Sequence, residues 1–297
     1  MDTQTDLKRD SRTESNIRLL LRILRNPLVS ILALYYALYY VNAAGLYYTA
    51  VANADTGLVQ SLVSGASTVA NLLLVYLTFA YFVERRPVTE LALPRMGREL
   101  GFGLLLGFGL ITACVLIAMA LGIYRIDGFD SWQNMLPTGI ALSLPVYEEL
   151  AFRGVVFRIL EGMFGSWVAL VLSSLVFGGV HMVNGGESLA GVASIAFVLG
   201  PMLVAPFLIT RRLWLGIGLH AAWNYTMGKI YAINVSGTPS PGLFKATFAG
   251  PELLTGGNAG MEGSLICILV ALTFTVVMLV LAARRGNIVP PSWTRKH

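Results

Sequence analysis

Residues 136–160 read LPTGIALSLPVYEELAFRGVVFRIL, and this stretch decides the class of the protein. It has the length and apolar composition of a membrane-spanning helix, yet its middle holds Glu148, Glu149 and Arg153. An ionised side chain at the centre of a bilayer costs roughly 2.5–3.5 kcal/mol even on a lenient scale, so each needs a partner or water. On a helix Glu149 and Arg153 are four positions apart and can pair, whereas Glu148 points about 100° away and needs another partner. The stretch therefore predicts a polar site inside a membrane helix.

The composition of the whole chain agrees with this class. The 297 residues are 56% apolar and only 12% charged, whereas a soluble domain usually has about 25% charged residues. The mean hydropathy is +0.69. Apolar runs of about twenty residues are too long for the strands of a membrane barrel, which alternate over about ten residues. We therefore predict an all-α polytopic membrane protein, a bundle of about eight transmembrane helices, from the runs Leu28–Tyr48, Leu58–Val83, Leu100–Ile123, Leu136–Leu160, Trp167–Val183, Leu189–Ile209, Leu213–Ile233 and Leu265–Ala283.

The basic residues predict the orientation of these spans. With a cytoplasmic amino terminus and eight crossings, seventeen of the 21 Lys and Arg residues fall on the cytoplasmic side. Arg153 lies within a span, and only Arg125, Lys229 and Lys245 lie on or near the far side. This distribution obeys the positive-inside rule, so both termini are predicted to be cytoplasmic. The net charge of +5 is then a signal of topology, and we expect no nucleic-acid partner.

The domain organisation predicted is simple. Residues 1–27 form a basic cytoplasmic leader, residues 28–284 a single transmembrane catalytic domain, and residues 285–297 a cytoplasmic tail. Within the leader, the segment Asn16 to Asn26 has arginines and leucines at helical spacing, which suits either an amphipathic helix on the membrane surface or an extension of the first span. The Gly- and Pro-rich segment 234–263 is predicted as an extracytoplasmic loop, either a lid or disordered. Cys114 and Cys267 fall inside apolar spans and indicate neither a disulfide nor a nucleophile.

Three more polar residues lie in apolar spans. His181 ends the sequence FGGVH, and His220 and Asn224 frame HAAWN, so the latter two share one helix face. A single histidine in a membrane helix often serves only as an interhelical hydrogen-bonding group, and Glu149 with Arg153 alone could be a structural ion pair. Packing alone does not easily explain all six polar groups on three spans. We expect them to converge on one wet pocket inside the membrane.

These residue types suit hydrolysis by an activated water. A carboxylate and an imidazole can deprotonate a water, while a second imidazole and an amide can stabilise the oxyanion that forms at a carbonyl. The sequence has no G-x-S-x-G elbow and no H-E-x-x-H helix, which argues against a serine hydrolase and the usual zinc protease. No cofactor is expected, but Glu148, His181 and His220 could instead hold zinc with one open position, and this alternative stays open.

The series Glu148-Glu149-x-x-x-Arg153, Phe177-x-x-x-His181 and His220-x-x-x-Asn224 resembles the motifs of the CPBP intramembrane proteases. This family includes the CAAX-processing type II and bacteriocin-processing enzymes, also called the abortive-infection family. The resemblance covers about residues 100–233 and implies eight transmembrane helices around an intramembrane catalytic cavity. It implies that Glu148 and His181 activate water, that Glu149 and Arg153 arrange the site, and that His220 and Asn224 form the oxyanion hole.

The resemblance also implies a substrate class. We expect a membrane-associated peptide or a lipidated protein as substrate and the plasma membrane of a prokaryote as the location; the sequence does not predict the oligomeric state. Two alternatives from other classes are a proton- or ion-coupled transporter and a non-catalytic membrane scaffold. One detail of depth conflicts with a simple bundle, because Glu148 lies near mid-span and His181 near the outer end of its run. A shifted or re-entrant fifth helix, or a bend at Pro145, would reconcile them.

Overall fold

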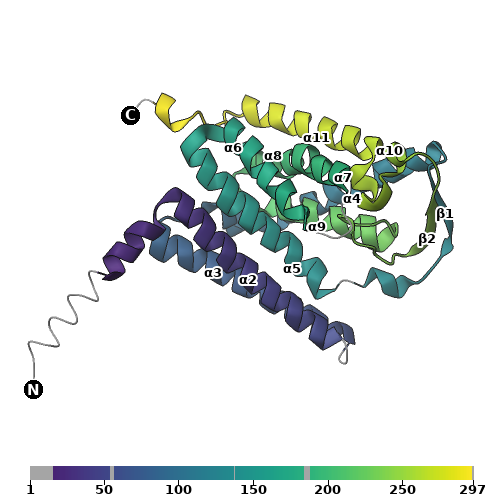
Figure 1. Ribbon diagram of the computed structural model, residues 1–297, viewed down its shortest axis with the longest axis horizontal. Coiled ribbons are helices and arrows are strands. Elements are labelled where there is room, and N and C mark those ends of the chain that lie inside the picture. The colour runs from purple at the N-terminus through teal and green to yellow at the C-terminus, as the bar shows by residue number, and fades with distance from the viewer. Residues whose placement is uncertain (1–15, 54–56, 137, 184–187, 296–297) are drawn as a thin grey trace, which may run out of the picture.

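The computed structural model describes residues 16–53, 57–136, 138–183 and 188–295, with the side chains of residues 49–53 left aside. The first fifteen residues of the predicted leader and residues 296–297 of the predicted tail lie outside this part. The main elements are α2 (Pro27–Asn53), α3 (Gly57–Phe79), α4 (Met96–Ala120), β1 (Tyr124–Phe129), α5 (Gly139–Glu148), α6 (Arg158–His181), α7 (Leu189–Ser194), α8 (Gly200–Thr210), α9 (Trp214–Tyr225), β2 (Phe244–Phe248), α10 (Glu252–Thr255) and α11 (Leu265–Arg284). Figure 1 shows α2 and α3 as a pair along one flank, with the remaining helices bundled beside them.

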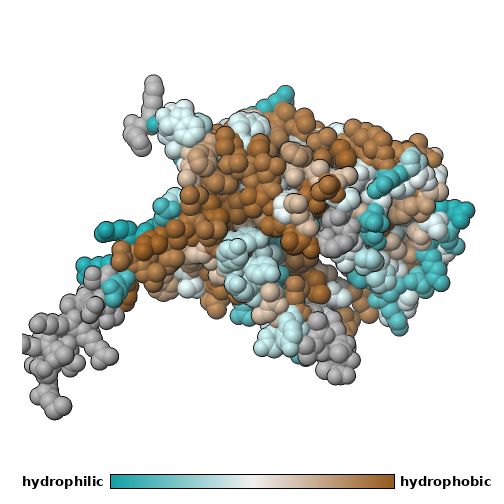
Figure 2. Space-filling view, in the orientation of Figure 1, coloured by the Kyte–Doolittle hydropathy of each residue, from teal (hydrophilic) through white to brown (hydrophobic). Residues whose placement is uncertain are grey.

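The bundle is that of a polytopic membrane protein, as predicted. Six helices in the described ranges are long and apolar enough to cross a membrane. The predicted count of eight stays a prediction. The fourth and fifth runs form one helical stretch interrupted at Gly165, which has a φ of 79°, and the seventh run is the shorter stretch from Trp214 to Ile230. Apolar side chains cover the flank of the bundle in Figure 2, as a membrane-embedded surface requires.

The leader is a helix over the described residues 16–24, and a turn at Arg25 and Asn26 separates it from α2. Most of its apolar side chains are exposed, with Ile17 at 52% and Leu20 at 54%. Such exposure suits a helix that lies against a membrane surface. The purple helix at the amino-terminal end of Figure 1 projects from the bundle accordingly.

The helix that carries the acidic motif changes its winding within the motif. Pro145 lies inside α5 without ending it, and the chain then continues as a π-helix, η5, from Glu149 to Phe157. A π-helix has i→i+5 hydrogen bonds, and such widenings often occur at functional sites. All nine residues of η5 are buried, so the widened turn faces the protein on every side. The irregularity expected near Pro145 is therefore a π-helix that begins four residues later.

Close contact between α4 and α9 holds α9, the helix that carries His220 and Asn224, in place. A Cβ atom on Gly103 would lie 2.4 Å from the carbonyl oxygen of Leu215, and one on Gly218 would lie 2.3 Å from that of Leu100. Both separations are too short for any side chain. Small residues at such crossings let two backbones pack directly, which is a common way for membrane helices to associate.

The segment 234–263 is folded and is the main departure from an all-helical architecture. β2 pairs antiparallel with β1, and Tyr124 lies opposite Phe248 in the register. Burial raises the pKa of the Tyr124 phenol, whose hydroxyl donates a hydrogen bond to the carbonyl of Tyr231. Figure 1 shows this two-stranded sheet at the end of the bundle away from both chain termini.

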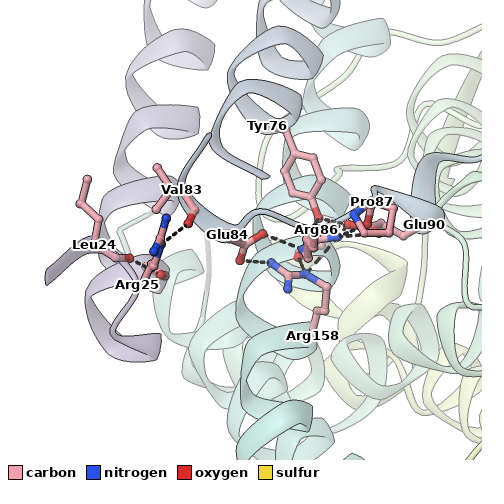
Figure 3. Close-up of polar contacts among 11 residues, drawn as sticks. Leu24, Arg25, Tyr76, Val83, Glu84, Arg86, Pro87, Glu90 and Arg158 are labelled. Atoms are coloured by element: carbon pink, nitrogen blue, oxygen red, sulfur yellow. Dashed lines mark hydrogen bonds and ion pairs between the residues drawn. The ribbon is translucent and has the colours of Figure 1, made fainter. Parts of the chain in front are cut away.

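A network of ion pairs occupies the opposite end of the bundle (Figure 3). The hydroxyl of Tyr76 donates to a carboxylate oxygen of Glu90 at 2.5 Å, and Arg158 pairs with Glu84 at 2.6 Å. Arg86 contacts both glutamates and so joins the two pairs. Because these groups come from α3, the following loop and α6, the network ties three segments together at this end.

Candidate active site

A cavity of about 560 Å³ lies among α5, α6, α8, α9 and the loop before β2. Four of the six predicted site residues line it: Glu148, His181, His220 and Asn224. They come from three separate helices, since Glu148 ends α5, His181 ends α6, and His220 and Asn224 lie on α9. The three motifs therefore converge on one space, although four of the six groups expected there line it. His181 stays at the end of its helix, and the cavity extends far enough to reach it.

The other two predicted residues, Glu149 and Arg153, lie behind the cavity wall. They form an ion pair of 3.0 Å, and each side chain is only 1% exposed. The guanidinium of Arg153 also lies over the ring of Phe177, 4.6 Å from its centre. The pair predicted from the four-residue spacing thus forms, and its position makes it a support for the residues in front of it.

His220 is held by both glutamates of the motif. Its Nδ1 atom lies 3.0 Å from Glu149 and its Nε2 atom 3.4 Å from Glu148. Glu149 can approach α9 because residue 216 is a glycine, where a Cβ atom would lie 2.9 Å from a Glu149 oxygen. Glu149 therefore contacts Arg153 and His220 at once, and it fixes the imidazole ring in relation to the α5–η5 helix.

His181 is oriented by its own helix. Its Nδ1 atom lies 2.7 Å from the carbonyl oxygen of Phe177, which can only accept a hydrogen bond. This contact assigns the proton to Nδ1 and leaves Nε2 with a free lone pair. Among the described contacts, none joins His181 directly to Glu148, although both line the cavity.

Asn224 lines the cavity with its side chain unengaged. In the described part of the chain, its amide group has no hydrogen-bond partner. The side chain is half-buried and faces the cavity. It lies one helical turn after His220 on the same face of α9. Both side chains can therefore present donors to one atom of a bound molecule.

The same residues do not fit a metal site in this arrangement. No three His, Cys, Asp or Glu side chains of the described ranges come together closely enough to hold a metal ion. The three zinc ligands considered from the sequence, Glu148, His181 and His220, all belong to those ranges. Both ring nitrogens of His220 already face carboxylates. We therefore derive no step through a metal.

A second carboxylate that lines the cavity, Glu262, was not predicted. Trp223 donates from its indole nitrogen to Glu262 at 3.0 Å, and the backbone of Ser236 donates to its other oxygen at 2.8 Å. Burial raises the pKa of the Glu262 carboxyl, and these donors oppose that rise. Glu262 fastens the loop to α9 at the residue before Asn224. The available signal was an acidic residue three positions before an apolar span, but hydropathy gave no reason to expect its burial.

Together the fold and cavity define a polytopic membrane protein with a polar, partly charged pocket within the bundle. Residues 130–226 match the family described as Type II CAAX prenyl endopeptidase Rce1-like. This segment contains all six predicted site residues and confirms the resemblance to the CPBP intramembrane proteases. Neither the curated proteins nor the solved structures gave a match. This match supports the general activity of an intramembrane endopeptidase. Together with the apolar helices, it supports an integral membrane protein.

Proposed function

We propose that the protein hydrolyses a peptide bond of a membrane-associated or lipidated substrate with a water activated by Glu148 and His181. The observation that carries the proposal is the convergence of the three motif helices on one cavity. That cavity holds two groups able to take a proton and two able to donate hydrogen bonds. General acid–base groups of this kind typically contribute about 10²–10⁴-fold to a rate.

The reaction begins with a water between the Glu148 carboxylate and the free nitrogen of His181. As the water attacks the substrate carbonyl, its proton passes to one of these two groups. The new C–O bond makes a tetrahedral oxyanion, and no covalent bond to the enzyme forms. The proton then goes to the leaving nitrogen, which departs as an amine when the C–N bond breaks.

The oxyanion is stabilised by His220 and Asn224 from α9. A His220 ring with a proton on both nitrogens donates from Nδ1 to the Glu149 carboxylate and from Nε2 to the oxyanion. The free amide of Asn224 supplies a second donor one turn away. Donors fixed in place before the reaction act most strongly where charge develops, which is in the transition state. Glu149 and Arg153 contribute by holding His220.

The test is cleavage of a randomised peptide library by the purified protein in detergent. Glu148→Gln keeps the size of the side chain but removes its basic oxygen, so turnover should fall by at least about 10²-fold. The matched control is Glu252→Gln on α10, an exposed carboxylate away from the cavity, which should cleave like the unaltered protein. If the Glu148 variant keeps most of its turnover, the residue is not the base. A purified protein that cleaves no peptide would favour a transporter or scaffold instead.

A further inference from the structure

The cavity opens at one particular end of the bundle. Thr138 precedes α5, His181 ends α6 and Lys229 lies in the last turn after α9, and all three line the cavity. Residues of the 235–240 loop complete its rim. Each of these positions lies where a helix meets the β1–β2 end. The mouth of the cavity is therefore on the side of the two-stranded sheet.

The depth of the candidate residues agrees with access from this side. Glu148 follows Thr138 by ten positions, which corresponds to about 15 Å along a helix. This is about half of the roughly 30 Å hydrocarbon thickness of a bilayer. A peptide that enters from the sheet side therefore reaches Glu148 at mid-depth without crossing the other half of the membrane.

The other end of the bundle is closed. The pairs of Arg158 with Glu84 and of Tyr76 with Glu90 lie there, as Figure 3 shows. Next to Arg158 of this network, Phe157 packs edge to face against Phe207, and both rings are buried. No residue of the network lines the cavity.

The closed end is also the basic end. Of the seventeen Lys and Arg residues in the described ranges, thirteen lie at or beyond this end: Arg18, Arg22, Arg25, Arg85, Arg86, Arg95, Arg98, Arg158, Arg211, Arg212, Arg284, Arg285 and Arg295. Of the other four, Arg153 lies within η5, and Arg125, Lys229 and Lys245 lie at the mouth end. Cytoplasmic segments of membrane proteins carry this excess of positive charge. The amphipathic leader helix, which belongs at a membrane surface, is on the same side.

We infer that the cavity opens to the extracytoplasmic side, and that the substrate presents its scissile bond there. The inference rests on the proposed function and adds its sidedness. The substrate class is a peptide at the outer membrane–water boundary, either free or as the outer flank of a membrane-anchored protein. A lipidated chain end on the cytoplasmic face would meet the closed, basic end of the enzyme.

Sidedness is tested first by labelling intact cells with a membrane-impermeant maleimide. Cys114 and Cys267 are buried, so the unaltered protein gives the background. Two single variants form a matched pair, because Leu253 at the mouth end and Leu93 at the basic end are exposed leucines, at 64% and 69%. We expect Leu253→Cys to react in intact cells and Leu93→Cys only after lysis. The reverse pattern would overturn the inference.

The second measurement separates sidedness from activity. Protein carrying Leu253→Cys is reconstituted into phosphatidylcholine–phosphatidylglycerol vesicles, and the outward-facing fraction is counted by labelling. A water-soluble peptide that the detergent-solubilised protein cleaves is added outside. The cleavage rate should rise in proportion to the fraction with Leu253 outward. A rate that follows the opposite fraction refutes the sidedness alone, whereas no cleavage in detergent refutes the proposed function.

Discussion

The buried pair of Glu149 and Arg153 gives the sharpest test of how the site is supported. Each side chain is 1% exposed, and the guanidinium retains one unsatisfied nitrogen, Nε. Removal of one partner leaves the other charge buried, which typically costs about 3–5 kcal/mol. With about 2–4 °C of melting temperature per kcal/mol for a chain of this order of size, either Glu149→Met or Arg153→Met should lower the melting temperature by about 6–20 °C.

The double variant should behave differently for stability and for activity. Two methionines leave no unpaired charge, and replacement of a buried pair by apolar residues is often nearly neutral. We expect the double variant to lose less free energy of unfolding than the two single variants added together, by at least about 2 kcal/mol. Turnover should stay low in all three variants, because His220 loses its Glu149 contact or the support behind it.

The assay is thermal unfolding in mild detergent together with peptide cleavage. The control is the exposed pair of Arg125 and Asp127, whose arginine side chain is 78% exposed. The same methionine changes there should alter stability by only about 0–1 kcal/mol. If the double variant at 149 and 153 is as unstable as the sum of its single variants, the pair is not coupled and the reasoning fails.

Three further predictions concern the cavity. Asn224→Ala should lower kcat by about 10²–10³-fold with little change in KM or melting temperature, measured together in detergent; a loss that is wholly instability or raised KM contradicts an oxyanion role. Prolonged treatment with a strong chelator should leave turnover intact. The metal alternative would be favoured if the purified protein contained stoichiometric zinc, lost activity when the zinc was removed and regained it when the zinc was returned. Burial raises the pKa of the Glu262 carboxyl above the 4.5 of an ordinary glutamate, so ionisation of this carboxyl opposes folding. The free energy of unfolding should therefore fall as the pH rises from about 4.5 through the folded-state pKa of Glu262. Glu262→Gln should flatten that part of the pH profile, and an unchanged profile would show that Glu262 does not cause it.

The sequence predicted the helices and the candidate residues because each leaves a local signal. Apolar runs mark the spans. The charges of Glu149 and Arg153 are unfavourable inside an apolar span unless the two side chains pair. The match over residues 130–226 agrees with the motif series. The sequence also predicted that Glu148 needs another partner, although it did not identify His220 as that partner. That contact depends on how α5 and α9 pack.

Other features had no local signal. The π-helix over η5 depends on packing around nine buried residues, since its composition is that of an ordinary helix. The pairing of β1 with β2 joins segments more than a hundred residues apart, and such contacts leave little trace in a single sequence. Glu262 is buried for the same reason, because its partners Trp223 and Ser236 come from distant turns of the chain.

The break at Gly165 has a consequence for how the chain is assembled. A Cβ atom at this position would lie 2.8 Å from Val289 and Pro291, and Ser166 exchanges hydrogen bonds with Val289. Residues 289–291 are translated only after every span from α2 to α11. The hairpin at Gly165 must therefore enter the membrane before its cover exists. Early in synthesis this turn stands open at the end of the bundle that later holds the ion-pair network, so a stalled or truncated nascent chain would expose it to quality-control proteases.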